Sequence, residues 1–278
     1  EAKESPYMLS YDDKMEYSGK QLPPMVEEKS AINLNFSILQ DFFDCAYRFK
    51  LSMFYGFVQP IAAAMGYGNV VHNIVRNIHK KYLDGENLTR EDVQAIVEDT
   101  FYLPYANSKM EQNMLESAKK SVDMYFEKNK ADFKNIEMAE ADIELDMGDG
   151  VKVNGRIDLV KHREISGEEK ITIVDFKTAD RDVTQCLEAE QLKIYALGYQ
   201  ELTGKSADYL EILNLDKVES ERVRVTEGLT ETVAKDIRNA AQNIRENKLD
   251  RKCSKEKCSA CYLNYLCLSK EEKKTYVE

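Results

Sequence analysis

Two carboxylates and a lysine lie on neighbouring segments that both have the pattern of β-strands. Asp158 belongs to residues 151–160, and Asp175 and Lys177 end residues 170–177. Because side chains alternate between the two faces of a strand, Asp175 and Lys177 project from one face, about 7 Å apart. Burying such charges is costly unless something binds them. Two carboxylates suit Mg²⁺ or Mn²⁺, which can polarise a phosphodiester and activate water, while the lysine stabilises charge on the phosphate.

Three further polar side chains lie at helical spacing. His72 belongs to a helical pattern that also carries Arg76, and Gln191 and Tyr195 are four residues apart in a later helical pattern. Residues four apart share one helical face, so Gln191 and Tyr195 project from the same side of that helix. Taken alone, His72 is more often a partly buried helix histidine, the Gln–Tyr pair an ordinary helix surface, and an Asp-x-Lys pair a surface ion pair.

The cysteines form a second constellation near the C-terminus. Cys258-x2-Cys261-x5-Cys267 offers three closely spaced thiolates, and a four-coordinate metal or cluster needs one more ligand. Cys253 would complete a local zinc site, whereas Cys45 is a distant alternative. This clustering favours a metal over a disulfide framework.

Apolar periodicity divides the chain into a helical part and a sheet-forming part. Residues 1–30 carry prolines and charges with little periodicity, which predicts a linker or tail. Helical spacing dominates from residue 35 to 130, with Ser37 as the expected cap of a first helix over 35–55. Three adjacent strands are then expected, followed by a helix, two strands and a last helix. These segments are 137–146, 151–160, 170–177, 184–202, 209–213, 222–225 and 230–247.

The pattern predicts one α/β domain over 31–278. Its helical part spans 35–130, its sheet core 137–248 and its cysteine-rich tail 253–268. The composition, 43% hydrophobic and 32% charged in 278 residues, excludes wholly disordered and collagen-like classes. A net charge of −11 excludes a broad basic surface for nucleic acid, so any DNA contact must be local or provided by a partner. No apolar run is long enough for a membrane span and no signal-peptide core is present, so we expect a cytoplasmic protein without a membrane partner.

Four motifs in this order resemble the PD-(D/E)xK nuclease superfamily, and specifically its RecB-like branch. They are Gly68-x3-His72, Gly155-Arg156-Ile157-Asp158, Asp175-Phe176-Lys177 and Gln191-x3-Tyr195. The resemblance covers about 35–268. It implies a restriction-endonuclease-like core, in which a central mixed sheet is flanked by helices, and a Mg²⁺- or Mn²⁺-dependent deoxyribonuclease of exonuclease type.

The resemblance also implies a role for each matching residue. His72, Asp158, Asp175 and the backbone carbonyl of Phe176 would be metal ligands, and Lys177 the catalytic lysine. Gln191 would hold the lysine or the nucleophilic water, and Tyr195 a DNA phosphate. Arg48 and Arg76 are candidate nucleic-acid contacts.

The segment around Cys45 resembles the first ligand segment of the iron–sulfur subset of RecB-like nucleases. The resemblance implies that this chain binds a 4Fe–4S cluster with a structural role. Its ligands would be Cys45, Cys258, Cys261 and Cys267. The sequence departs from the subset in having Ala46 where a proline is usual. Residues 36–45 and 103–106 are similar to nuclease domains at the C-terminal end of UvrD-like helicases, which implies a helicase domain or subunit as partner and single-stranded DNA as substrate.

Two other functions stay open at this point. One is a catalytically inactive nucleic-acid-binding module of the same fold, which the intact Asp158, Asp175 and Lys177 argue against. The other is a zinc-dependent interaction module with an incidental Asp-x-Lys pair. Analysis of iron and sulfide against zinc would separate these possibilities.

Overall fold

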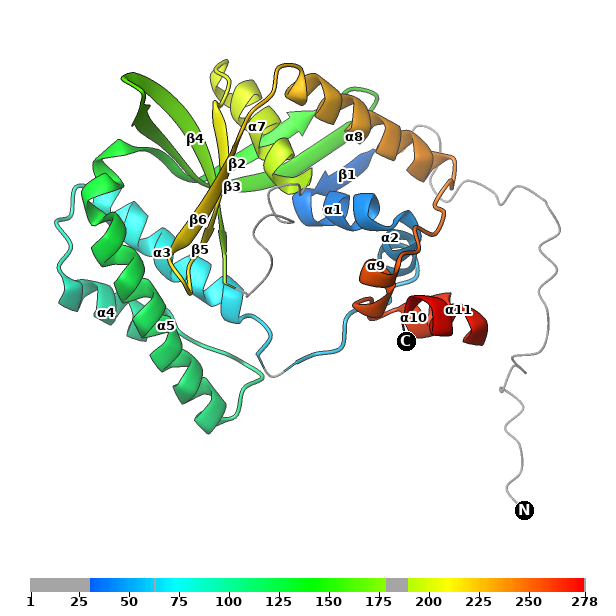
Figure 1. Cartoon of the computed structure of the whole chain (residues 1–278), viewed down its shortest axis with the longest axis horizontal. Coiled ribbons are helices and arrows are strands. Elements are labelled where there is room, and N and C mark those ends of the chain that lie inside the picture. The colour runs from blue at the N-terminus through cyan, green and yellow to red at the C-terminus, as the bar shows by residue number, and fades with distance from the viewer. Residues whose placement is uncertain (1–30, 63, 179–189, 278) are drawn as a thin grey trace.

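The protein, as a computed structural model, is built on one six-stranded mixed sheet that helices cover on both faces (Figure 1). The structure describes residues 31–62, 64–178 and 190–277. The strand order is β1-β3-β4-β5-β6, and β2 pairs with β3. The predicted α/β fold with a central mixed sheet is therefore confirmed. The tail at 1–30 and the predicted helix start at 184–189 lie outside the described residues.

The elements of the first half are mainly helical, as the periodicity predicts. They are β1 (Ile32–Asn35), α1 (Phe36–Asp44), α2 (Ala46–Met53), α3 (Tyr67–Leu83), α4 (Arg90–Thr100), α5 (Ser108–Asn129) and the 3-10 helix η1 (Lys130–Asn135).

The second half supplies five of the strands and ends in the cysteine-rich tail. Its elements are β2 (Ile136–Asp146), β3 (Val151–Ile165), β4 (Glu168–Lys177), α7 (Glu190–Thr203), β5 (Tyr209–Asn214), β6 (Glu219–Arg224), α8 (Leu229–Arg245), α9 (Lys255–Ser259), α10 (Asn264–Cys267) and α11 (Lys270–Tyr276).

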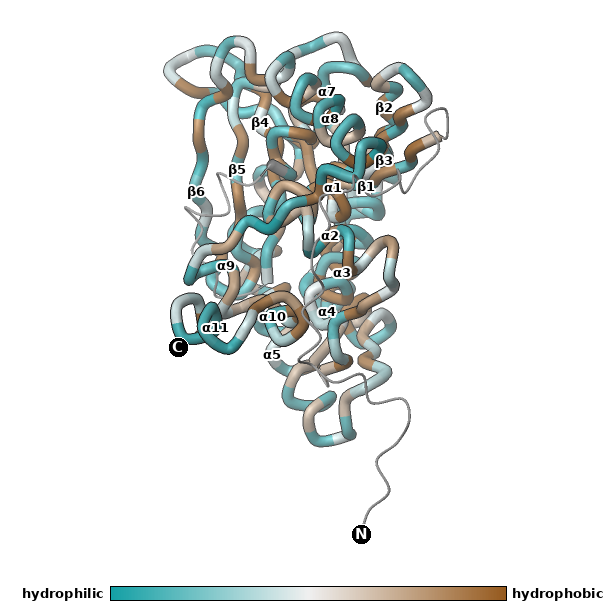
Figure 2. Tube along the Cα trace, turned by 90° about the vertical axis from the view of Figure 1, so that its right-hand side faces the viewer, coloured by the Kyte–Doolittle hydropathy of each residue, from teal (hydrophilic) through white to brown (hydrophobic). Residues whose placement is uncertain are grey.

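Two hydrophobic cores lie on opposite faces of the sheet. Helices α1, α7 and α8 cover one core, and α3, α4 and α5 cover the other (Figure 1). Along β4, Ile173 belongs to the first core and Val174 and Phe176 to the second, as period two predicts. Along β3, Ile157 packs with Val151 and Val153 as expected, whereas Leu159 belongs to the other core. Figure 2 shows hydrophobic residues as short segments among hydrophilic ones.

The N-terminal elements differ from the sequence prediction in two ways. The strand β1 was not expected; it pairs in parallel with Val151–Asn154 of β3, a long-range contact that local periodicity does not reveal. The predicted helix over 35–55 is broken at Cys45, which adopts an extended conformation between α1 and α2. Asn35, and not Ser37, caps α1, because its side chain accepts a hydrogen bond of 2.8 Å from the N–H of Ile38.

None of the helices in the described ranges is long and apolar enough to cross a lipid bilayer.

Candidate active site

The predicted catalytic residues meet in one pocket of about 380 Å³ where α3, α7, β3 and β4 converge. Most of the sequence-predicted residues line it. The lining residues are Ser37, Gly68, Asn69, His72, Asp158, Asp175, Phe176, Lys177, Thr178 and Gln191. Tyr195 lies one helical turn beyond Gln191 and is buried. Ser37 and Asn69 were not predicted as site residues: Asn69 occupies a variable position of the Gly68-x3-His72 motif, and Ser37 was expected to cap a helix.

Two motif glycines let the elements approach closely enough to form this pocket. A Cβ atom on Gly155 would lie 2.0 Å from the ring of Phe36, and one on Gly68 would lie 2.7 Å from Oγ1 of Thr178. A side chain at position 155 would displace the buried Phe36 ring or α1, and one at position 68 would displace the hydroxyl of Thr178, which lines the pocket. The glycines of the two motifs are therefore required by packing.

The two carboxylates are buried side by side. The register that pairs Leu159 with Val174 places Asp158 beside Asp175 on the neighbouring strand. Burial raises the pKa of Asp175, and burial followed by the charge of Asp175 raises the pKa of Asp158 well above its ordinary value. Two adjacent carboxylates in this environment favour a shared proton or a bound cation. Alternation along β3 puts Asp158 on the same face as the polar residues Lys152, Asn154 and Arg156; those three are exposed, whereas Asp158 is buried.

Lys177 and Tyr195 hold Asp175 from two sides. The Nζ atom of Lys177 lies 2.7 Å from Oδ2 of Asp175, and the hydroxyl of Tyr195 donates a hydrogen bond to the same carboxylate. The Nε2 atom of Gln191 donates a hydrogen bond of 2.6 Å to the hydroxyl of Tyr195. Gln191 and Tyr195 thus lie on one helical face, as the four-residue spacing predicts, and Tyr195 contacts Asp175 while Gln191 contacts Tyr195.

His72 is neutral and faces the other carboxylate. Its Nδ1 atom lies 3.6 Å from Oδ2 of Asp158, and its ring donates a hydrogen bond to the carbonyl of Phe176. Burial, and then the charge of Lys177, lowers the pKa of His72 to about 4. A neutral imidazole is the form that binds a metal. His79, one helical heptad later, is fully buried and bonded to the hydroxyl of Tyr125 at 2.8 Å, which is a structural role.

The donor set fits a hard divalent cation, although within the described ranges no three His, Cys, Asp or Glu side chains are arranged to hold a metal ion as they stand. Asp175 Oδ2 is in contact with the lysine but makes no hydrogen bond of good geometry, so this buried oxygen has unused acceptor capacity. Mg²⁺ needs only one or two protein carboxylates, since water and substrate phosphate complete its coordination. Asp158 and Asp175 would hold such an ion.

The structure adds Glu140, which no sequence pattern indicated. Ala139 pairs with Leu159 and Ala141 with Ile157, so Glu140 lies across from Asp158. Its φ of 54° is a left-handed conformation that a residue other than glycine seldom adopts.

Of the three predicted nucleic-acid contacts, Arg76 and Tyr195 lie near this site, but Tyr195 is buried against Asp175 and not presented to solvent. Arg76 and Arg156 both lower the pKa of the Glu140 carboxyl, against a larger effect of burial that raises it. Arg48 instead makes ion pairs of 2.7 and 3.0 Å with Asp41 and Asp44. Arg48 lines the cysteine pocket, so the structure does not place it with the catalytic residues.

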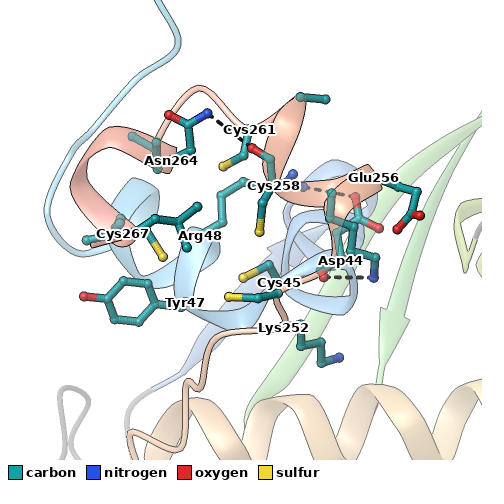
Figure 3. Close-up of a pocket in the computed structure, with 16 residues that line it drawn as sticks. Asp44, Cys45, Tyr47, Arg48, Lys252, Glu256, Cys258, Cys261, Asn264 and Cys267 are labelled. Carbon is teal, nitrogen blue, oxygen red and sulfur yellow. Dashed lines mark hydrogen bonds and ion pairs between the residues drawn. The ribbon is translucent and has the colours of Figure 1, made fainter. Parts of the chain in front are cut away.

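The cysteines lie around a second pocket, of about 370 Å³, between the α1–α2 break and the tail. Cys45, Cys253, Cys258, Cys261 and Cys267 all line it, and Figure 3 shows four of them from both segments around one space. Burial, and then the neighbouring Cys258, raises the pKa of the Cys253 thiol to about 11. The chemistry of five thiols fits a thiolate-bound metal or cluster. Both candidates for the fourth ligand, Cys45 and Cys253, are present.

Two lysines fix the tail to the end of α1. Lys252 donates a hydrogen bond of 3.0 Å to the carbonyl of Phe43, and Lys257 one of 3.2 Å to the carbonyl of Asp44. Cations are favoured at a helix C-terminus, where the backbone carbonyls lack partners. The extended backbone at Cys45, which ended the predicted helix early, is what presents this thiol to the tail.

The chain is similar to a known protein family and to two solved structures. Residues 33–268 match the PD-(D/E)XK nuclease superfamily. The crystal structure of a protein named "Putative exonuclease" from Eubacterium rectale aligns with a TM-score of 0.51 and 13% identity, over 87% of this chain and 90% of that one. The crystal structure of SSO0001 aligns with a TM-score of 0.34 and 19% identity, over 80% and 93% of the two chains. No curated protein gives a significant match. The family match covers residues 33–268, which is most of the chain, and the pocket contains Asp158, Asp175 and Lys177. The chain therefore belongs to the PD-(D/E)XK nuclease superfamily.

Proposed function

We propose that this nuclease is a Mg²⁺- or Mn²⁺-dependent deoxyribonuclease of exonuclease type that acts on single-stranded DNA. The observation that carries the proposal is the pair of buried carboxylates, Asp158 and Asp175, whose pKa values are raised by burial and which meet Lys177 in one pocket. A buried pair of this kind is costly unless a cation and a substrate use it.

Each residue of the pocket has a role in this reaction. A divalent ion held by Asp158 and Asp175 would polarise the scissile phosphate and supply an activated water. His72 and the carbonyl of Phe176 are further donors on the same side. Lys177 is placed to neutralise charge that develops on the phosphate.

The second layer of the site keeps that geometry fixed. Gln191 orients the hydroxyl of Tyr195, and Tyr195 orients Asp175. The ring of Tyr195 in turn packs against Phe36, with 5.0 Å between the ring centroids. We propose Arg76 and Arg48 as phosphate contacts outside the pocket, with Arg76 the nearer of the two to the carboxylates through Glu140.

The test is digestion of end-labelled oligonucleotides with Mg²⁺, Mn²⁺ or a chelator. We expect release of short products from linear single strands with either metal, and none with chelator or with Asp175→Asn. Asp99→Asn, an exposed aspartate on α4, is the matched control and should retain activity. Cleavage of circular single strands would contradict the exonuclease assignment, and metal-independent cleavage would contradict the metal role.

We also propose that the cysteine pocket holds a 4Fe–4S cluster through Cys45, Cys258, Cys261 and Cys267. Support comes from the presence of these thiols around one pocket and from the break in the helix that presents Cys45. A metal here would join the first helix to the tail, which is a structural role. Anaerobic purification followed by iron, sulfide and zinc analysis tests it, and stoichiometric zinc without sulfide would favour the Cys253 site.

A helicase, as a domain or a subunit, is the proposed partner. Its support is the similarity of residues 36–45 and 103–106 to helicase-linked nuclease domains, and the net charge of −11, which makes delivery of the strand by a partner useful. The test is the rate of product release from duplex DNA with and without an ATP-driven helicase. We expect the helicase to increase this rate, because it supplies unwound single strands.

A further inference from the structure

A long part of the chain between the two pockets has no charged side chain. Between Lys50 and Arg76, residues 51–75 contain no Asp, Glu, Lys or Arg, although 32% of all residues are charged. Instead of being buried, much of this part is exposed: Tyr55 is 57% exposed, Val58 80% and Ile61 65%. Large apolar side chains gathered on a surface in this way mark a binding surface.

The exposed apolar residues of this part form a strip together with two residues of the tail. We define the apolar strip as Met53, Tyr55, Phe57, Val58, Ile61, Tyr265 and Leu266, all of which are exposed.

The two parts of the strip are joined by hydrogen bonds. The hydroxyl of Tyr262 lies 2.9 Å from Oγ of Ser52 and donates to the carbonyl of Phe57 at 3.4 Å. The N–H of Phe57 donates to the carbonyl of Leu51 at 3.1 Å. The rings are thus presented on a fixed backbone, which lowers the entropy lost when something binds to them.

The strip leads to the catalytic pocket. Four of its residues, Tyr55, Phe57, Val58 and Ile61, belong to the connection between α2 and α3, which passes from the cysteine-rich tail to the start of α3 (Figure 1). The first residues of α3 then line the catalytic pocket through Gly68, Asn69 and His72. The connection and the wall of the pocket thus meet at the start of α3.

We propose that the apolar strip binds the unpaired bases of the substrate strand, with Tyr55 as a base-stacking platform. The inference rests on the proposed function for the identity of the strand. Bases of a single strand stack on exposed aromatic rings, whereas bases of a duplex already stack on each other. In a chain with a net charge of −11, a path without carboxylates is also one along which phosphates meet no local repulsion. The strip therefore selects single-stranded nucleic acid.

A tryptophan reporter tests binding without any cleavage. The chain has no tryptophan, so Tyr55→Trp introduces a single fluorophore at the strip. With chelator present, we expect single-stranded oligonucleotide to quench its fluorescence in a saturable way, and duplex of the same length to have a much weaker effect. Val223→Trp is the control, because Val223 is exposed on the edge strand β6 and lies away from the pocket. It pairs with Leu210, which pairs with Ile173, whereas Lys177 pairs with Asn214 at the other end of β5. Equal quenching of both reporters, or of neither, would refute the proposal.

A second variant separates binding to the strip from catalysis. Tyr55→Ala should weaken single-strand binding about tenfold, and Tyr55→Phe should not, since the ring is retained. Hydrolysis of a small substrate, the nitrophenyl ester of thymidine 5′-phosphate, should be the same in both, because it fits the catalytic pocket alone.

The outcomes distinguish this inference from the proposed function. Quenching of Tyr55→Trp in a protein that cleaves no DNA would leave the strip assignment intact and overturn the nuclease proposal. If the wild-type protein cleaves DNA but Tyr55→Ala binds single strands as tightly as wild type, the nuclease proposal stands and the strip assignment is refuted. A dimer in solution that Tyr55→Ala converts to a monomer, with DNA binding unchanged, would make the strip a subunit interface and refute the inference.

Discussion

Replacement of Gly155 by alanine tests the packing that positions the catalytic strand. The added methyl group would lie 2.0 to 2.2 Å from three atoms of the Phe36 ring, which is 4% exposed and has no free space to move into. Carbon atoms pack best at about 3.5–4.0 Å, so either β3 or α1 must shift. The Phe36 ring lies against Tyr195, with 5.0 Å between centroids, so a shift there reaches the group that orients Asp175.

The expected loss follows from overpacking of a closed core. Such insertions cost about 1–3 kcal/mol, and each kcal/mol lowers the melting temperature of a large domain by roughly 2–4 °C. Gly155→Ala should therefore melt several degrees lower and lose more activity on single strands than its folded fraction accounts for. Thermal and urea unfolding measure the first effect, and initial digestion rates measure the second.

A double variant shows whether Phe36 is the cause. Phe36→Leu makes room for the methyl group. The double variant should therefore lose less free energy of unfolding than the two single variants lose together, by about 0.5–3 kcal/mol. Asn154→Ala, at the exposed neighbouring position of β3, should change stability little. Additive effects, or an unchanged melting temperature for Gly155→Ala, would refute this explanation of the glycine.

The other predictions concern charge and metal. Lys177→Met should lower the rate of strand cleavage about 100- to 1,000-fold, and a rate close to wild type would remove the lysine from the mechanism. Metal-free Lys177→Met should also melt earlier, because the buried Asp175 loses its ion-pair partner. Since the pKa of His72 falls from 6.5 to about 4 on folding, its contribution to the free energy of unfolding is fully present above pH 6.5 and is lost as the pH falls towards 4. Urea unfolding of His72→Gln over this range should show a weaker pH dependence. Asp158 has the opposite sign, because its raised pKa makes stability fall as the pH rises above the ordinary aspartate range; Asp158→Asn should remove that fall in metal-free protein. Cys45→Ser should lose iron and melt earlier, whereas Cys253→Ser should keep iron; zinc retained by the first variant and lost by the second would reverse the ligand assignment.

The parts of the site that the sequence predicted are those that depend on local geometry. Asp175 and Lys177 share a face because strand side chains alternate, and Gln191 and Tyr195 share one because helices repeat every 3.6 residues. In the structure Lys177 and Tyr195 contact the carboxylate of Asp175, and Gln191 contacts the hydroxyl of Tyr195. The ends of β2, β4, β5, β6 and α8 were likewise predicted to within three residues, whereas β3 continues five residues beyond its predicted end.

The features that were missed depend on contacts between distant residues. The strand β1 exists only because Val151–Asn154 is available to pair with it. The break at Cys45 interrupts a regular apolar pattern, and the tail that closes on this thiol is more than 200 residues away in the chain. Glu140 faces Asp158 through an irregular part of β2, which alternation of residue types does not reveal.

The burial of Asp158 also depends on contacts between residues that are distant in the chain. These contacts explain where the site lies in the sheet. β2 occupies one edge of β3 along most of its length, so β1 and β4 share the other edge, at 151–154 and from Leu159 onward. Asp158 lies just before the point where pairing with β4 begins. There the N–H of Phe176 has no strand partner and donates instead to the carboxylate of Asp158, at 2.8 Å, while the carbonyl of Phe176 accepts from His72. A buried backbone N–H needs an acceptor. At the change of strand partner the carboxylate of Asp158 is that acceptor, and the hydrogen bond fixes it beside Asp175.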